Sequence, residues 1–180
     1  MKSKIRLSVM CTLFALLLVS CGNKETKQWS NFYDYSIEDI AGQYSYSNLV
    51  KSFDGIEPSQ YVHICEDAVI GITPVSATTI SFNVNCPESG FSKTFVGKPT
   101  KNKYDNMIRM STGFTPAKDG KVRAYNVLAS VYRNDALQTR LHGYASLTIY
   151  KLVEHHYGNE SRIDTVADIS NNYYFDVIKN

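Results

Sequence analysis

The stretch TISFNVNC, residues 79–86, decides the fold class of the chain. Its apolar and polar residues alternate, which places Ile80, Phe82, Val84 and Cys86 on one side of an extended backbone. A period of two residues is that of a β-strand with one buried face, whereas an amphipathic helix repeats every 3.6 residues. The stretch therefore predicts a strand that turns an apolar face toward a core.

The sequence predicts similar strands on both sides of this stretch. We expect them at residues 43–47, 61–66, 91–96, 107–111, 122–132, 139–152 and 173–178. Pro, Gly, Asn and Asp separate these segments, as turns require. Asp119-Gly120 is the clearest hairpin signal, and residues 133–135 predict the next turn. Residues 36–39 have the spacing of a capping box, which predicts one helical turn. The chain is therefore expected to be all-β and antiparallel.

The number of strands limits the architecture. Seven to nine short antiparallel strands form either a closed barrel or two packed sheets. We expect a barrel of about eight strands, with a two-sheet β-sandwich as the alternative. The expected organisation is a signal peptide at residues 1–20, a tether at residues 21–36 and a single β domain at residues 37–180.

The residues that open the β domain favour the barrel. The motif DIAGQY, residues 39–44, resembles the Gly-x-Trp opening of lipocalins and related calycin-like proteins, with Tyr44 in the place of the tryptophan. The resemblance implies a barrel with Tyr44 near its closed end. We expect seven side chains to point inward: Ile80, Phe82, Val84, Val127, Ala129, Leu147 and Ile149. The small residues Ala129, Gly143 and Ala145 are expected to leave room for a ligand cavity.

The N-terminal segment predicts where the protein resides. Three basic residues precede a 13-residue apolar stretch, residues 7–19, which is too short to span a bilayer and suits the apolar region of a secretory signal. Leu18-Val19-Ser20-Cys21 resembles the lipobox of bacterial lipoproteins. The resemblance implies cleavage before Cys21 and acylation of that cysteine, with lipid-anchored localisation at the outer membrane, facing the periplasm or the cell surface. The alternative is an ordinary signal peptide in which Cys21 is incidental.

The charge of the chain disfavours nucleic acid as a partner. The precursor has a net charge of +2, but removal of residues 1–20 leaves 16 basic and 17 acidic residues, a net charge of −1. No block of basic residues supplies the electrostatic footprint that nucleic-acid binding needs.

Two cysteines in the β domain are candidates for a disulfide. If Cys11 is removed with the signal and Cys21 is acylated, Cys65 and Cys86 are the only two cysteines left to pair. In an oxidising compartment such a pair predicts a disulfide. Two buried thiols that act as small apolar side chains are the alternative.

The histidines do not predict catalysis or a metal site. Adjacent His155 and His156 point to opposite faces if they lie on a strand, and no further ligand stands at a metal-binding spacing, so we interpret them as part of a solvated loop. His63 and His142 each stand singly on the polar side of a predicted strand. The expectation is therefore no cofactor, no metal and no enzymatic activity, although paired carboxylates that meet only in space would escape a sequence search.

One short motif predicts a modification. Asp164-Thr165-Val166 is similar to the O-glycosylation acceptor of some Gram-negative anaerobes, which implies a glycan on Thr165. The alternative is a plain surface loop between the last two strands.

Three functional hypotheses follow. We favour a lipid-anchored envelope module that binds a small apolar ligand or a glycan, for which the sign is an aromatic and aliphatic pocket. The alternative is a structural or assembly lipoprotein that contacts another envelope protein, for which the sign is a filled interior and an exposed apolar patch. The third is a hydrolase, which needs two converging carboxylates or histidines.

Overall fold

The computed structural model describes residues 28–46, 53, 56–100, 105–117, 119–158 and 160–180. They form ten strands, a single helical turn and one 3-10 turn. The elements are β1 (Trp29–Asn31), α2 (Ile37–Ile40), β2 (Gly42–Tyr46), β3 (Val62–Ile64), β4 (Val69–Pro74), β5 (Ile80–Cys86), η1 (Pro87–Ser89), β6 (Phe91–Gly97), β7 (Met107–Pro116), β8 (Val122–Asn134), β9 (Thr139–Tyr157) and β10 (Glu160–Lys179).

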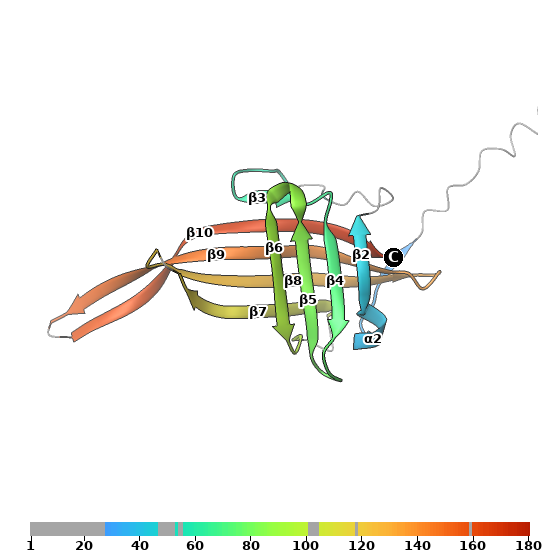
Figure 1. The fold of residues 1–180 in the computed structure, drawn as a ribbon, viewed down its shortest axis with the longest axis horizontal. Helices are drawn as coiled ribbons and strands as arrows, with labels where there is room; N and C mark the ends of the chain where they lie inside the picture. The colour runs from blue at the N-terminus through green and yellow to red at the C-terminus, as the bar shows by residue number, and fades with distance from the viewer. Residues whose placement is uncertain (1–27, 47–52, 54–55, 101–104, 118, 159) are drawn as a thin grey trace, which may run out of the picture.

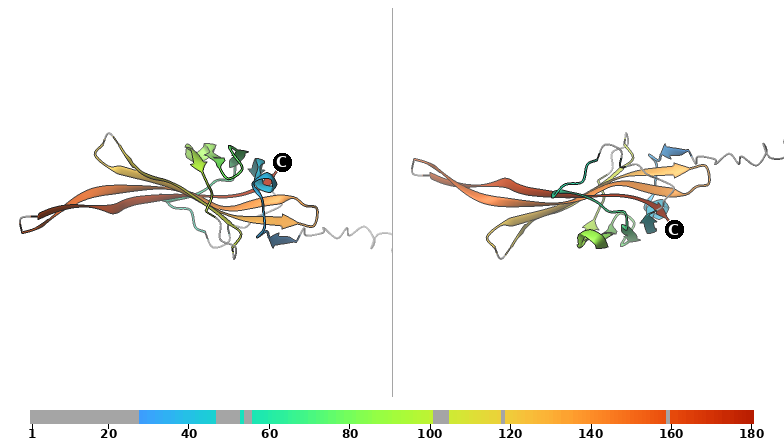
Figure 2. Two further views of the ribbon diagram at one scale, coloured as in Figure 1. Left: turned by 90° about the horizontal axis from the view of Figure 1, so that it is seen from below. Right: turned by 90° about the horizontal axis from the view of Figure 1, so that it is seen from above.

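All ten strands belong to one bent sheet. Its order is β1-β8-β9-β10-β2-β4-β5-β6, with β7 also paired to β8 and β3 also paired to β10. Every pairing is antiparallel except that of β3 with β10. In Figure 1, β2, β4, β5 and β6 run across the front of the long strands β7 to β10, and Figure 2 shows the two groups as separate layers.

The sheet is not closed. Cα atoms of β6 and β7 approach within 8 Å, yet no pairing joins these two strands among the residues described. The predicted all-β antiparallel class is confirmed. The closed barrel is not confirmed, and the two layers agree with the two-sheet alternative.

The core lies between the layers. Ile80, Phe82 and Val84 on β5 are all 0% exposed, and Val127 and Ala129 on β8 face them from the other layer. These five predicted inward positions are confirmed. Leu147 and Ile149 on β9 continue the same face by register, but they are only partly buried. The reason is that β9 extends further than the layer formed by β4 to β6 (Figure 1).

The predicted helical turn is present as α2. The Ser36 hydroxyl accepts a hydrogen bond from the Asp39 backbone N–H at 3.2 Å, and the Asp39 carboxylate accepts one from the Ser36 N–H at 2.9 Å. Both halves of the capping box are therefore formed. The turn delivers Tyr44 into the core, where its side chain is fully buried and its hydroxyl donates to the Ile40 carbonyl at 2.6 Å.

Three segments that were not predicted as strands are extended in the structure. Trp29–Asn31 in the predicted tether forms β1 and pairs with β8, because its backbone completes the edge that β7 leaves free. Val69–Pro74 forms β4, a short strand that alternation around Gly71 did not reveal. Residues 155–157 and 160–172 of the polar stretch before the last predicted strand belong to β9 and β10, because these two strands pair with each other there.

Candidate functional site

The most conspicuous feature is a projecting two-stranded ribbon. Pairing of β8 with β9 ends at Val122 and Tyr150, whereas β9 and β10 remain paired as far as Tyr157 and Glu160. Residues 151–157 and 160–167 are therefore a hairpin with no third strand among the described residues, and we call this hairpin the ribbon. Figures 1 and 2 show it leaving the two layers at one end of the molecule.

One face of the ribbon carries exposed apolar side chains. Cross-strand register places Leu152 opposite Thr165 and Ile163 opposite Glu154, so all four share a face. Leu152 is 49% exposed and Ile163 is 64% exposed. At the base of the ribbon Tyr150 meets the ring of Phe114 edge-on, with ring centroids 5.2 Å apart. We define these apolar residues as the apolar stripe: Phe114, Tyr150, Leu152 and Ile163.

An ionic cluster holds the base of the ribbon. A β-bulge between Ala167 and Ile169 leaves Asp168 as an extra residue in β10. Its carboxylate binds the Lys151 ammonium at 2.6 Å and the Lys121 ammonium at 3.3 Å. The hydrogen bond from Lys151 is the main reason that the pKa of Asp168 lies below its usual value. Because Lys121 belongs to the β7–β8 turn, the cluster ties the ribbon to the neighbouring hairpin.

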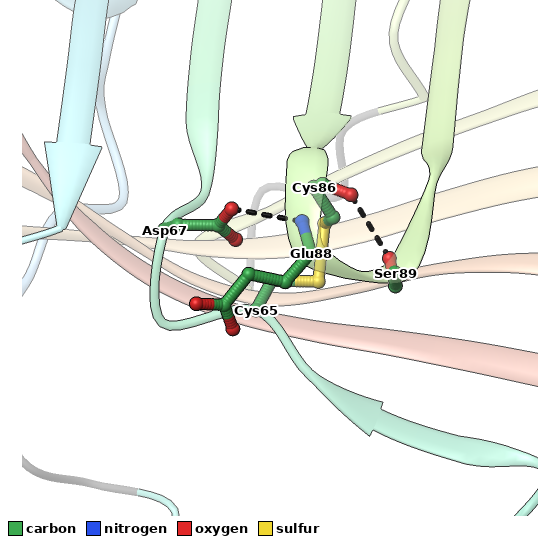
Figure 3. Close-up of a disulfide and its surroundings, with 5 residues drawn as sticks. All are labelled: Cys65, Asp67, Cys86, Glu88 and Ser89. Atoms are coloured by element: carbon green, nitrogen blue, oxygen red, sulfur yellow. Dashed lines mark hydrogen bonds between the residues drawn. A yellow bond between two sulfur atoms is a disulfide. The ribbon is translucent and has the colours of Figure 1, made fainter.

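The predicted cysteine pair is joined. Cys65 and Cys86 form a disulfide with their Cα atoms 5.4 Å apart (Figure 3). Cys65 follows β3 and its N–H donates to the Tyr174 carbonyl on β10, whereas Cys86 ends β5. The bond therefore connects the two layers. The Asp67 carboxylate beside it accepts a hydrogen bond from the Glu88 N–H at 2.9 Å.

A buried ion pair lies on the face of β9 and β10 that is turned away from β5. The Arg140 guanidinium donates from Nε to Asp176 Oδ1 at 2.6 Å, and its Nη2 lies 2.5 Å from Oδ2. Asp176 is only 1% exposed, and His142 Nδ1 lies 3.4 Å from its Oδ2. The rings of Trp29 and Tyr132 flank the guanidinium. Sequence reasoning missed this cluster, although alternation along β9 places Arg140 and His142 on one face.

The remaining histidines contact different groups. His63 stacks on Tyr173 with ring centroids 4.9 Å apart. His155 and His156 lie on opposite faces of the ribbon, as expected for adjacent strand residues, but the solvated loop predicted for them was wrong. In the part of the chain that the structure describes, no group of three or more His, Cys, Asp and Glu could hold a metal ion.

The two clefts found among the described residues are not lined by the small residues Ala129, Gly143 and Ala145. Ala129 and Ala145 are both 0% exposed. A Cβ atom on Gly143 would lie 2.0 Å from the Leu128 carbonyl oxygen, so the backbone of β8 already fills that space. The small residues allow β8 and β9 to approach closely instead of lining a pocket.

Two clefts are lined by residues of β7, β8 and their neighbours. A cleft of about 510 Å³ lies beside the β7–β8 turn and is lined by Lys93, Asp119, Arg123 and Tyr125, among others. The Lys93 ammonium sits 4.1 Å from the centre of the Tyr125 ring, and Arg123 pairs with Asp119 at 2.8 Å. A smaller cleft of about 230 Å³ is lined by residues that include Arg109, Asn126 and Tyr144.

Of the two predicted modification sites, Thr165 and Cys21, only Thr165 is among the described residues. Thr165 is exposed on β10, in the ribbon rather than in a loop. Cys21 lies outside the described residues.

Comparisons with protein-family models, curated proteins and solved structures found no match. The helices within the described ranges are too short to cross a membrane.

Proposed function

We propose that the protein is a lipid-anchored envelope protein that binds another protein molecule through the ribbon. The observation that carries this proposal is the apolar stripe, whose residues Leu152 and Ile163 are 49% and 64% exposed on a hairpin that the cluster around Asp168 holds in place. Contiguous exposed apolar surface on a soluble domain marks an interaction site. The anchor rests on the resemblance of residues 18–21 to a lipobox.

The interior of the protein supports this function over ligand storage. A binding module of the predicted kind needs an apolar pocket, whereas the buried side chains of Ala129 and Ala145 belong to one core cluster with Phe82. Hydrolysis needs two converging acid or base groups. The described lining of the two clefts includes one carboxylate, Asp119, and it is paired with Arg123.

Site-specific photo-cross-linking in cells tests the ribbon. A photoreactive residue at Thr165 should give a discrete adduct with one protein, because Thr165 lies opposite Leu152 on the face that carries the stripe. The same residue at Ser92, exposed on β6, is the matched control. Leu152→Asp should abolish the Thr165 adduct. Equal adducts from Thr165 and Ser92 would contradict the proposal.

Cell fractionation tests the anchor independently. The natural chain should sediment with membranes, and metabolic labelling with a fatty acid should mark the peptide that begins at Cys21. Cys21→Ala should yield uncleaved or soluble protein without label. A mature N-terminus at another residue, without lipid, would refute anchoring and leave the ribbon test unaffected.

The larger cleft supports a second candidate function, the binding of a glycan that bears a carboxylate. The Lys93 ammonium lies over the Tyr125 ring in this cleft, and Lys93 has no carboxylate partner among the described ion pairs. An array of neutral and uronic-acid oligosaccharides is the probe. Binding restricted to the acidic sugars and lost in Lys93→Ala supports this function, and binding unchanged by Lys93→Ala excludes the cleft.

A further inference from the structure

We infer that the molecule bound by the ribbon is a second copy of this chain, joined by antiparallel pairing of the two β10 strands about Ile163. The inference rests on the proposed function, because it names the partner of the same surface.

The outer edge of β10 is open where the pairing would form. One edge of β10 hydrogen-bonds to β9, whereas the other receives β3 only from Asn172 and β2 only from Val177. Between residues 160 and 171 no described strand pairs with this edge. A row of unpaired backbone N–H and C=O groups is a template for another strand.

The charges on this edge are complementary to themselves. In a two-fold antiparallel pairing centred on Ile163, each Arg162 stands opposite the other copy's Asp164. These two side chains already form an ion pair within one molecule, with Arg162 Nε 2.8 Å from Asp164 Oδ1. Both charges therefore lie on the same face of this edge before two copies meet. Opposite charges directly across two strands stabilise the pairing, and like charges destabilise it.

The neighbouring registers are unfavourable. A two-fold axis perpendicular to the sheet leaves the same face of both ribbons on the same side of the joined sheet. In every register that this axis allows, one residue lies directly opposite its own copy. Moving the centre by one residue places Arg162 opposite Arg162 or Asp164 opposite Asp164. Of these three registers, only the one centred on Ile163 avoids both repulsions.

The same register buries part of the stripe. Ile163, which is 64% exposed, would lie against its own copy, and Ser161 would lie opposite Thr165 on that face. Two ribbons would become one four-stranded sheet with both stripes on one side. Such an interface is isologous, the commonest kind in homodimers.

The other free edge is less suited to this pairing. Glu154 on β9 stands opposite Ile163 in the ribbon. A two-fold pairing of two β9 edges centred on Glu154 would therefore place the two Glu154 carboxylates opposite each other, which is repulsive.

Cysteine cross-linking of the full chain in cells tests the register. Cα atoms opposite each other across antiparallel strands lie within disulfide range, so Ile163→Cys should give a disulfide-linked dimer on mild oxidation. Arg162→Cys and Asp164→Cys should each cross-link poorly alone and well when co-expressed with different tags. Equal cross-linking of all three single variants would overturn the register.

Charge reversal gives the decisive control. Arg162→Asp or Asp164→Arg should lower the yield of the Ile163→Cys dimer by roughly five-fold or more, because each creates two like-charge pairs, and the double reversal should restore it. An unchanged melting temperature under reducing conditions shows that each variant is folded. If Thr165 cross-links to a different protein and no Ile163→Cys dimer forms, the inference fails and the proposed function stands. If neither product appears, both fail.

Discussion

The body of the molecule and the ribbon are built from the same two strands. In the body, Leu141 on β9 and Phe175 on β10 are both 0% exposed, whereas Val166, which lies opposite Lys151 on the same face further along the two strands, is 48% exposed. In both regions β9 and β10 are paired with each other. What differs is the second layer, which covers β9 and β10 in the body and ends before the ribbon (Figure 2). Alternation thus fixes the direction of a side chain, and a second layer determines its burial.

Truncation of large apolar side chains should give the largest difference between the two regions in the free energy of unfolding. Phe82→Ala in the body should lower the free energy of unfolding by about 3–5 kcal/mol, because Phe82 is fully buried and leaves a cavity. Ile163→Ala in the ribbon should change it by less than about 0.5 kcal/mol in the monomer. Urea denaturation of the two variants measures the contrast. Similar losses in both would mean that the ribbon is packed.

Removal of the disulfide should weaken the body and spare the ribbon. The bond closes a loop with a sequence separation of 21 residues, so Cys65→Ala together with Cys86→Ala should cost about 3 kcal/mol in the loop-entropy model. Natural protein should show no free thiol from this pair in denaturant before reduction. The double cysteine variant should melt at a lower temperature than the natural protein, without a change in the yield of the Ile163→Cys dimer at temperatures where the body remains folded.

A methyl group added between β8 and β9 should test how closely the body is packed. Gly143→Ala should destabilise by about 1–3 kcal/mol, since its Cβ would collide with the Leu128 carbonyl oxygen. Gly97→Ala is the matched control, because its Cβ would meet only the end of Met110 at 3.9 Å. Thermal melts of both variants measure the difference between their losses of stability. A neutral Gly143→Ala would restore the cavity interpretation.

The smallest loss of stability predicted for the body concerns the capping box at its entrance. Ser36→Ala should cost about 1 kcal/mol at neutral pH. The hydrogen bond from the Ser36 N–H lowers the pKa of Asp39 from its ordinary value of 3.8. A lowered pKa in the folded state stabilises the protein above pH 3.8, and this contribution is lost as the pH falls through the folded value.

Comparison of the natural chain with Asp39→Asn at several pH values measures this last effect. The difference in stability between the two proteins should shrink on acidification. A difference that grows below pH 4 would contradict the assigned direction. Ile163→Ala, which touches no capping group, should show no such pH-dependent difference.

The body was largely predictable because local patterns determine it. The alternation in residues 79–86, the capping box at Ser36 and the Asp119-Gly120 turn all depend on residues close in sequence, and each formed as predicted. The pairing of Cys65 with Cys86 was predictable because the other two cysteines were assigned elsewhere.

The rest depends on which segments meet in space. The polar stretch that forms the outer part of the ribbon has little alternation of its own, and the pairing of β9 with β10 makes it a strand. The small residues of β8 and β9 indicate either a pocket or a close approach, and only the position of Leu128 distinguishes them. The ion pair between Arg140 and Asp176 joins residues 36 positions apart, for which the sequence has no signal.

The position of the disulfide also has a consequence for biosynthesis. Cys65 and Cys86 flank the β4–β5 hairpin, whose register brings Val69 opposite Asn85. This covalent ring can close once residue 86 has emerged from the translocation or synthesis machinery, while β7 to β10 are still to come. The last strand then binds an element that is already cross-linked, because Tyr174 on β10 accepts the N–H of Cys65. An oxidising enzyme that acts early would thus prepare the docking edge for the C-terminal half of the chain.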